Sequence, residues 1–188
     1  PPVALETARG WIGNGAQRLV ERALTQDFDG EAPAQLMETA YPLFQKCYQA
    51  NLHRDSVLYA GAVKTLAQCQ AAGRRVGCVT NKPAAFTLPL LKAMGLSRYL
   101  DPIVSGDDLP KKKPDPLPLE HVAGQWGLAP AECLLVGDSV SDFRAARACG
   151  MPVVLVSYGY SQGLDLFELG PDAVIDSLAK VLNIIDVV

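Results

Sequence analysis

Short apolar runs and amphipathic stretches alternate along the chain from about residue 56 onward. The run 134–136 shows no polar alternation, which is typical of a strand buried on both faces of a parallel sheet. The run 76–80 predicts a further buried strand, and 152–156 predicts another strand. Two shorter strands are expected at 103–105 and 173–175. Between these runs, apolar residues recur every three or four positions, and several stretches stop at a glycine. This alternation predicts an α/β fold with a doubly wound parallel sheet.

The helices that accompany these strands are expected at 61–72, 84–94, 117–126, 178–181 and directly after residue 139. The first 55 residues differ, because they show helical periodicity alone. Turns are expected at Trp11–Gly15 and Asp27–Gly30, where glycine or asparagine interrupts the helical pattern. Such a short helical segment cannot form a stable core by itself. We therefore expect a helical domain at 1–55 and an α/β domain at 56–188.

Composition excludes several classes of protein. A net charge of −3 and a hydrophobic fraction of 49% over 188 residues are typical of a soluble folded protein and argue against non-specific nucleic-acid binding. No apolar run approaches the roughly 20 residues that span a bilayer, and no secretory signal is visible. The five cysteines form neither a CxxC pair nor a zinc spacing, so we expect reduced thiols in a cytoplasmic protein. Both a monomer and a homodimer remain open.

Two carboxylates that are four residues apart follow the apolar run 134–136. Asp138 comes where the strand should end, and Asp142 comes about one helical turn later, with Ser139 or Ser141 able to cap the helix. Ligands of open α/β sheets gather at this end of the strands. Two hard oxygen donors at such a place are suited to Mg²⁺. A capping aspartate followed by a surface aspartate would give the same pattern.

Polar groups also follow another expected strand and one loop. Thr80 and Asn81 come directly after the run 76–80, where they could donate hydrogen bonds to phosphate oxygens beside a helix start. Both residue types are also common in ordinary turns. Lys113 ends a run of three lysines, and the proline that follows keeps it extended. It is our candidate for a lysine that turns inward as a counter-charge; a solvated basic loop is the alternative.

In this order and spacing, the three segments resemble motifs of the haloacid dehalogenase superfamily of phosphohydrolases. Val79-Thr80-Asn81-Lys82-Pro83 resembles its second motif, Lys113-Pro114-Asp115-Pro116 its third, and Gly137-Asp138-Ser139-Val140-Ser141-Asp142 its fourth. Within the superfamily the chain is most similar to phosphoglycolate phosphatases. The segments that carry this similarity are Trp11–Gly15, Gly106–Leu109, Lys112–Pro114 and Tyr158–Tyr160. The resemblance implies a Rossmann-like core, over which residues 1–55 close as a cap.

The resemblance also implies a role for each candidate residue. Thr80 would hold the transferring phosphoryl group with help from Asn81, and Lys113 would offset the charge of the nucleophile and phosphate. Asp138 would bind Mg²⁺ directly, and Asp142 would act next to it or through a water molecule. The substrate-binding residues implied for the cap and the fourth motif are Asn14, Gly15 and Ser139.

One motif of the family is not found in the sequence. The family begins with a strand that ends in Asp-x-Asp-Gly-Thr, whose first aspartate is the nucleophile and whose second is the general acid and base. Asp27–Gly30 is superficially similar, but it follows the polar pair Thr25-Gln26 at a helix end, and Glu31 stands in place of threonine. We therefore predict that the first strand and its nucleophile lie upstream of Pro1. These 188 residues alone should lack phosphatase activity and bind Mg²⁺ weakly.

Together these features predict a Mg²⁺-dependent phosphatase of a small phosphate monoester, with 2-phosphoglycolate as the expected substrate. A phosphatase or mutase acting on another sugar phosphate is one alternative, and a non-catalytic phosphate-binding module is another. A dehalogenase is disfavoured, because that branch needs no metal whereas the pair Asp138 and Asp142 is suited to one. We interpret Tyr158–Tyr160 as a structural turn with two packed aromatic rings.

Overall fold

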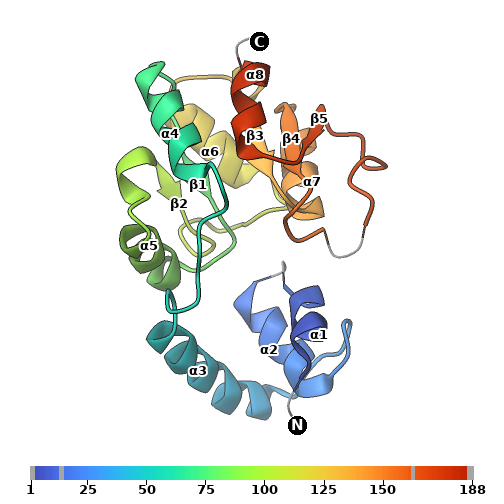
Figure 1. The fold of residues 1–188 in the computed structure, drawn as a ribbon. Helices are drawn as coiled ribbons and strands as arrows, with labels where there is room; N and C mark the ends of the chain where they lie inside the picture. Colours follow the sequence, from blue (N-terminus) through green and yellow to red (C-terminus); the bar gives the residue numbers. More distant parts are fainter. Residues whose placement is uncertain (1–2, 13–14, 162–163, 186–188) are drawn as a thin grey trace.

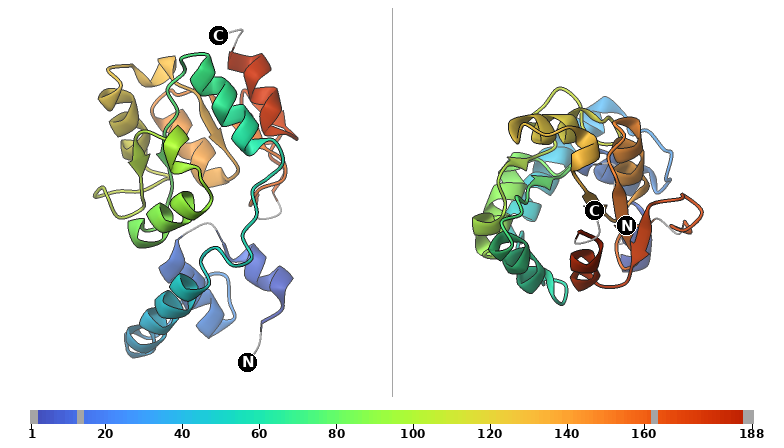
Figure 2. Two further views of the ribbon diagram at one scale, coloured as in Figure 1. Left: turned by 60° about the vertical axis from the view of Figure 1, so that its left-hand side comes forward. Right: turned by 90° about the horizontal axis from the view of Figure 1, so that it is seen from above.

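The computed structural model describes residues 3–12, 15–161 and 164–185. The first helices gather at one end of the molecule, and the other elements form a larger body at the opposite end (Figure 1). These helices are α1 (Leu5–Gly10), α2 (Ala16–Thr25) and α3 (Ala34–Ala50). The chain passes from α3 to α4 through one connection, which includes the expected boundary at residue 55 (Figure 2). The division into two domains at that residue stays a prediction.

Strands and helices alternate in the larger body, as the sequence predicts. In chain order they are α4 (Ala62–Ala71), β1 (Cys78–Val79), α5 (Ala84–Ala93), β2 (Ile103–Val104), α6 (Leu117–Gln125), β3 (Leu135–Gly137), α7 (Val140–Ala148), β4 (Val153–Val156), β5 (Ala173–Ile175) and α8 (Val181–Ile185). Short 3-10 helices stand at Ser97–Tyr99, Pro130–Glu132 and Leu178–Lys180. None of the described helices is long and apolar enough to cross a membrane.

The strands pair in parallel, as expected for this fold class. β4 lies between β3 and β5, with Leu135 opposite Val153, and β1 pairs with β2, with Cys78 opposite Ile103. Among the described residues no pairing joins β1 to β3, so the parallel sheet is present in two pieces (Figure 1). The carboxyl ends of β1 and β3 nevertheless come together, as the site below shows.

β4 is the centre of the core. Successive side chains of a strand point to opposite faces, and here both faces are covered. Val153 and Leu155 pack with α6 and α7, whereas Val154 and Val156 pack with β5 and α8. All four side chains of the strand are buried. The prediction of a strand at 152–156 is therefore confirmed, and the structure adds that both of its faces are buried.

The predictions of a buried strand at 76–80 and of a strand buried on both faces at 134–136 are wrong in their burial. The run 76–80 forms only a two-residue strand, and the residues of both β1 and β3 are half-buried. The physical reason is their position: each has a paired strand on one side only among the described residues. A strand at the edge of a sheet leaves part of its backbone and faces uncovered.

Helix ends agree with the glycine pattern. α5 and α6 stop just before Gly95 and Gly127, which have φ values of 69° and 67°. Residues with a side chain rarely adopt this left-handed conformation, which is why glycine follows so many helices. The helix expected at 178–181 forms a 3-10 turn that continues into α8.

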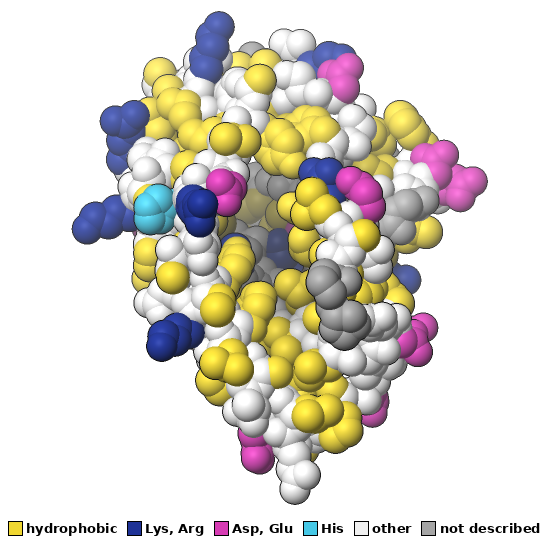
Figure 3. Space-filling view, turned by 60° about the horizontal axis from the view of Figure 1, so that its bottom comes forward, with side chains coloured by type: hydrophobic (Ala, Val, Ile, Leu, Met, Phe, Trp, Pro, Cys, Tyr) yellow, Lys and Arg dark blue, Asp and Glu magenta, His cyan; other side chains and the backbone are white. Residues whose placement is uncertain are grey.

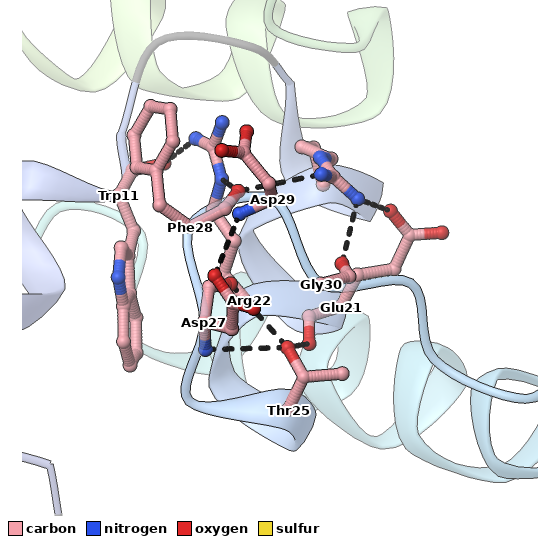
Figure 4. A network of polar contacts seen from close by, with 9 residues as sticks. Trp11, Glu21, Arg22, Thr25, Asp27, Phe28, Asp29 and Gly30 are labelled. Atoms are coloured by element: carbon pink, nitrogen blue, oxygen red, sulfur yellow. Dashed lines mark hydrogen bonds and ion pairs between the residues drawn. The ribbon is translucent and has the colours of Figure 1, made fainter.

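The helices α1, α2 and α3 form the helical end of the molecule, and a buried arginine holds it together. Arg22 of α2 donates from Nη1 to the Trp11 carbonyl oxygen and from Nε to that of Phe28, both at 2.7 Å (Figure 4). Its guanidinium also stacks over the Phe28 ring, 3.6 Å from the centroid. The predicted turn at Asp27–Gly30 is present, and the Asp27 carboxylate accepts a hydrogen bond from the Asp29 N–H within it. This segment follows a helix, so it is not the strand end that a nucleophile of this family requires.

Asp172, just before β5, gives a test of the fold by pH. Its carboxylate accepts the Val153 N–H at 2.7 Å and pairs with Arg147 at 2.9 Å, and these contacts hold the pKa of Asp172 below its ordinary value. A lowered pKa stabilises the fold above the unfolded pKa of about 3.9, and this is lost as the pH falls through the folded value. We expect Asp172→Asn to reduce stability at pH 7 by less than about 1 kcal/mol, because the pair is partly solvated. Urea titrations at pH 7 and pH 3 should show the difference shrinking at the lower pH.

Candidate active site

Lys113 connects the two pieces of the sheet. Its Nζ lies 2.6 Å from the carbonyl oxygen of Val79, the last residue of β1, and 2.6 Å from Oδ1 of Asp142 in α7. The side chains of Lys113 and Asp142 are only 10% and 7% exposed. The lysine therefore turns inward, as the sequence predicts for a counter-charge. Groups from the second, third and fourth motif segments meet at this point.

Asp142 is fully occupied by donors from its own helix start and from Lys113. Its Oδ2 accepts the N–H groups of Asp138 and Ser139 at 3.1 Å and the Ser139 hydroxyl at 2.7 Å. Ser139 is the N-cap of α7 and forms a reciprocal capping box with Asp142. Burial alone would raise the pKa of Asp142, but the Lys113 ammonium and the Ser139 hydroxyl outweigh it and hold the pKa below its ordinary value. Asp142 thus orients Lys113 and the first turn of α7.

Asp138 is the more open of the two carboxylates. Its Oδ2 accepts the Tyr160 N–H at 3.0 Å, while Oδ1 has no hydrogen-bond donor among the described residues. Burial, followed by the nearby charge of Asp142, raises the pKa of Asp138. A cation at Oδ1 would compensate for this loss of hydration, so Asp138 fits one ligand position of a Mg²⁺ site. The described residues contain no group of three or more His, Cys, Asp or Glu that could hold a metal by themselves.

The segment Tyr158–Tyr160 packs directly on Asp138, which the sequence interpretation as a structural turn missed. A Cβ added to Gly159 would lie 2.2 Å from Cβ of Asp138. The neighbouring ring of Tyr158 packs against Tyr59, with ring centroids 4.6 Å apart. The signal was present in the sequence, because a small residue follows β4 at the same end of the sheet as Asp138.

Thr80 and Asn81 directly follow Val79, whose carbonyl oxygen accepts the hydrogen bond from Lys113. Thr80 Oγ1 accepts the Lys82 N–H at 3.1 Å, and Asn81 Nδ2 donates to the Lys113 carbonyl oxygen at 2.8 Å. The Asn81 Oδ1 atom is buried and has no partner among the described residues. Asn81 therefore ties the turn after β1 to the loop that carries Lys113, and the Thr80 hydroxyl can still donate its own proton.

Gly106 shows how tightly this turn is packed. Its N–H donates to the Lys82 carbonyl oxygen at 2.9 Å, and an added Cβ would lie 2.2 Å from the backbone oxygen of Asn81. Because that neighbour is backbone, Gly106→Ala must displace the turn 80–82. We expect a fall of about tenfold or more in kcat/KM and a loss of about 1–3 kcal/mol in stability. Steady-state kinetics and urea unfolding of the variant in the full-length enzyme measure both, and unchanged kinetics would show that the turn tolerates the shift.

At Gly15 the helical end approaches the loop that carries the three lysines 111–113. This residue is the N-cap of α2 with a φ of 97°, and an added Cβ would lie 3.0 Å from Nζ of Lys112. Asn14, the other candidate from this turn, lies outside the described residues. Figure 3, which views the molecule from the side of the helical end, shows a recess near its centre with a basic side chain inside. The candidate groups of the core therefore lie near a junction with the helical end.

The parallel α/β fold and the buried pair of Lys113 and Asp142 agree with the class of hydrolase that the sequence resembles. The sequence profile of the haloacid dehalogenase-like hydrolases matches residues 8–156, and the chain belongs to this family. It is a phosphoric monoester hydrolase that resembles phosphoglycolate phosphatases. The resemblance noted in the sequence is thus confirmed.

The similarity to known proteins covers nearly all of the chain. A phosphoglycolate phosphatase of Nitrosococcus oceani is 45% identical over 185 residues, which cover 98% of this chain and 82% of that protein. The corresponding protein of Nitrosospira multiformis is 48% identical over 181 residues, covering 96% and 80%. The crystal structure of a predicted phosphoglycolate phosphatase from Haemophilus somnus superposes with a TM-score of 0.89 at 35% identity, covering 98% and 84%.

Proposed function

We propose that the protein hydrolyses 2-phosphoglycolate to glycolate and phosphate, with Mg²⁺ as cofactor. The observation that carries this is the contact of Lys113 with both Val79 and Asp142, beside the open oxygen of Asp138. Such an arrangement offers one fixed positive charge and one free carboxylate oxygen at a single edge of the sheet. Phosphoryl transfer chiefly requires positioning and compensation of oxygen charge. The names of the relatives support glycolate as the leaving group.

In this proposal each candidate residue has one task. Thr80 donates its hydroxyl to a phosphoryl oxygen, and Asn81 holds the backbone of Lys113. Lys113 offsets negative charge on the phosphoryl group and the nucleophile. Asp138 supplies an oxygen ligand to Mg²⁺, which when bound would further neutralise the phosphate. Asp142 orients Lys113, with Ser139 as the cap that fixes Asp142.

Gly15, with Asn14 next to it in sequence, contacts the substrate from the helical end. Residues 1–55 form the cap, and residues 56–188 form the core. No disulfide joins the five cysteines, all of which lie among the described residues, and this supports the proposal of a cytoplasmic enzyme.

The nucleophile, we further propose, comes from a strand outside these 188 residues. In the part of the chain that the structure describes, β1 and β3 each have no paired strand on the sides that Lys113 joins, so a parallel strand between them would complete the sheet. An aspartate at its carboxyl end would then stand close to Lys113. The relatives are also longer than this chain, which covers 82% and 80% of the two described above.

Kinetics on a panel of phosphate monoesters test this function. The full-length enzyme should prefer 2-phosphoglycolate over hexose phosphates and lose activity when EDTA removes Mg²⁺, whereas the 188-residue protein should be inactive. Preference for a hexose phosphate or the formation of an isomeric phosphate would favour the sugar-phosphate alternative. Phosphate binding by the full-length protein without any turnover would favour a non-catalytic module.

A further inference from the structure

Lys82 stands directly after the proposed phosphate-binding residues, and its backbone is held in place. Its N–H donates to Thr80 Oγ1 at 3.1 Å. Its carbonyl oxygen accepts the Gly106 N–H at 2.9 Å and the Thr87 hydroxyl at 3.0 Å. Three contacts therefore fix the position from which the side chain extends. Only the flexible stem and its ammonium are left to move.

The ammonium of Lys82 reaches the helical end. Nζ donates to the hydroxyl of Tyr48 in α3 and lies 4.7 Å from the centroid of that ring. The Tyr48 ring is itself anchored, since it packs edge-on against the buried ring of Phe86 at 5.0 Å and stacks on Phe44 at 5.4 Å. A tyrosine of the helical end thus holds a lysine of the core at the junction between them.

The charge of Lys82 has no carboxylate partner among the described residues, although the side chain is half-buried. This distinguishes it from two other lysines nearby: Lys113 is paired with Asp142, and Lys111 with Asp115. Tyr48 offers a neutral hydroxyl and the face of a ring, which orient a cation without cancelling its charge. A partly desolvated ammonium without a counter-ion is a favourable partner for an incoming anion.

We propose that Lys82 determines specificity by pairing with a second anionic group of the substrate, and that Tyr48 positions its ammonium. This inference rests on the proposed function. When the phosphoryl group lies between Thr80 and Lys113, the rest of the substrate extends toward the helical end. In 2-phosphoglycolate that part is a carboxylate. The substrate class is therefore a small phosphate monoester that carries a negative group on the side opposite to its phosphate.

Paired substrates separate this role from a structural one. Ethyl phosphate replaces the carboxylate of 2-phosphoglycolate with a methyl group, so it lacks the second anion and keeps the ester. We expect Lys82→Met in the full-length enzyme to raise KM for 2-phosphoglycolate about tenfold to a hundredfold, with kcat and the kinetics on ethyl phosphate nearly unchanged. Tyr48→Phe should give a smaller change in the same direction. The double variant should equal Lys82→Met, because the tyrosine acts through the lysine.

Lys112→Met is the matched control, because this lysine also faces the helical end but is exposed. Its KM for both substrates should stay within about twofold of the parent.

If Lys82→Met raises KM for both substrates equally, or if Lys112→Met alone shows the selective loss, the assignment of Lys82 is wrong. A parent enzyme that hydrolyses ethyl phosphate with the same kcat/KM as 2-phosphoglycolate overturns both the proposed substrate and this inference. A parent that discriminates while Lys82→Met still does so overturns only the inference. Lys82→Gln serves the same comparison if the methionine variant does not fold.

Discussion

Replacing Lys113 with methionine is expected to lower kcat/KM of the full-length enzyme by about 10³-fold or more. The substitution keeps much of the apolar stem but removes the ammonium that lies 2.6 Å from both the Val79 oxygen and Asp142. No other described lysine contacts these two groups, so nothing replaces the lost charge. Steady-state kinetics with 2-phosphoglycolate measure the effect. A variant that kept a tenth of the parent activity would remove Lys113 from the proposed mechanism.

The Lys113→Met variant could lose activity because it unfolds and not because its catalysis fails, and a second substitution separates the two causes. Lys113→Met leaves the Asp142 carboxylate buried without its counter-charge, which should destabilise the fold by about 3–5 kcal/mol. Adding Asp142→Asn removes the uncompensated charge, while an amide oxygen remains to accept the bonds of the α7 cap. The double variant should therefore regain much of the stability, as measured by urea unfolding, and remain inactive. Recovered activity would show that Lys113 is needed only for folding.

Asp138→Asn should have opposite effects on activity and on stability. We expect kcat/KM to fall by about 10²-fold or more and Mg²⁺ affinity to weaken, because an anionic ligand becomes neutral. In metal-free buffer at pH 7 the variant should be at least as stable as the parent. The folded pKa of Asp138 is raised, chiefly by burial, so the protonated form stabilises the fold at low pH and this is lost as the pH rises through that value. Asparagine stays neutral and avoids the loss.

Isothermal titration with MgCl₂ and thermal unfolding in EDTA check these two expectations. Repeating the melts at pH 3 gives an internal control, since the parent carboxyl is largely protonated in both states below the unfolded pKa of about 3.9 and the two proteins should unfold at nearly the same temperature. Unchanged Mg²⁺ affinity in the variant would exclude Asp138 as a ligand. A marked drop in metal-free stability at pH 7 would instead assign Asp138 a structural role at the Tyr160 N–H.

The sequence predicts a buried strand well where an apolar run is covered on both faces by other elements of the fold. The run 152–156 is apolar at every position, and β4 is covered on both faces. Runs 76–80 and 134–136 look similar, but each of β1 and β3 has a paired strand on one side only among the described residues. The short length of β1 and the half-burial of β3 follow from these edge positions, which depend on strand pairing and not on local sequence.

The candidate site shows the same division. The proline after Lys113 suggested a lysine directed inward, and Ser139 or Ser141 was expected to cap the next helix; the lysine does turn inward, and Ser139 is the cap. The contact between Lys113 and Asp142 could not be predicted, because the two residues are brought together only by the tertiary fold. The contact of Lys82 with Tyr48 was missed for a related reason: the ring falls within the apolar periodicity of α3, and periodicity does not show what a helix end touches.

The placement of the two tryptophans makes the enzyme convenient to study by fluorescence. Trp11 is buried in the helical end beneath the Arg22 contact, whereas Trp126 lies in the larger body, where its Nε1 donates to the Asp101 carbonyl oxygen at 3.2 Å. Within these 188 residues, a Trp126→Phe variant therefore carries Trp11 as its single indole, which reports on the helical end. Stopped-flow mixing of that variant with substrate would test whether the helical end rearranges and would time such a change separately from turnover.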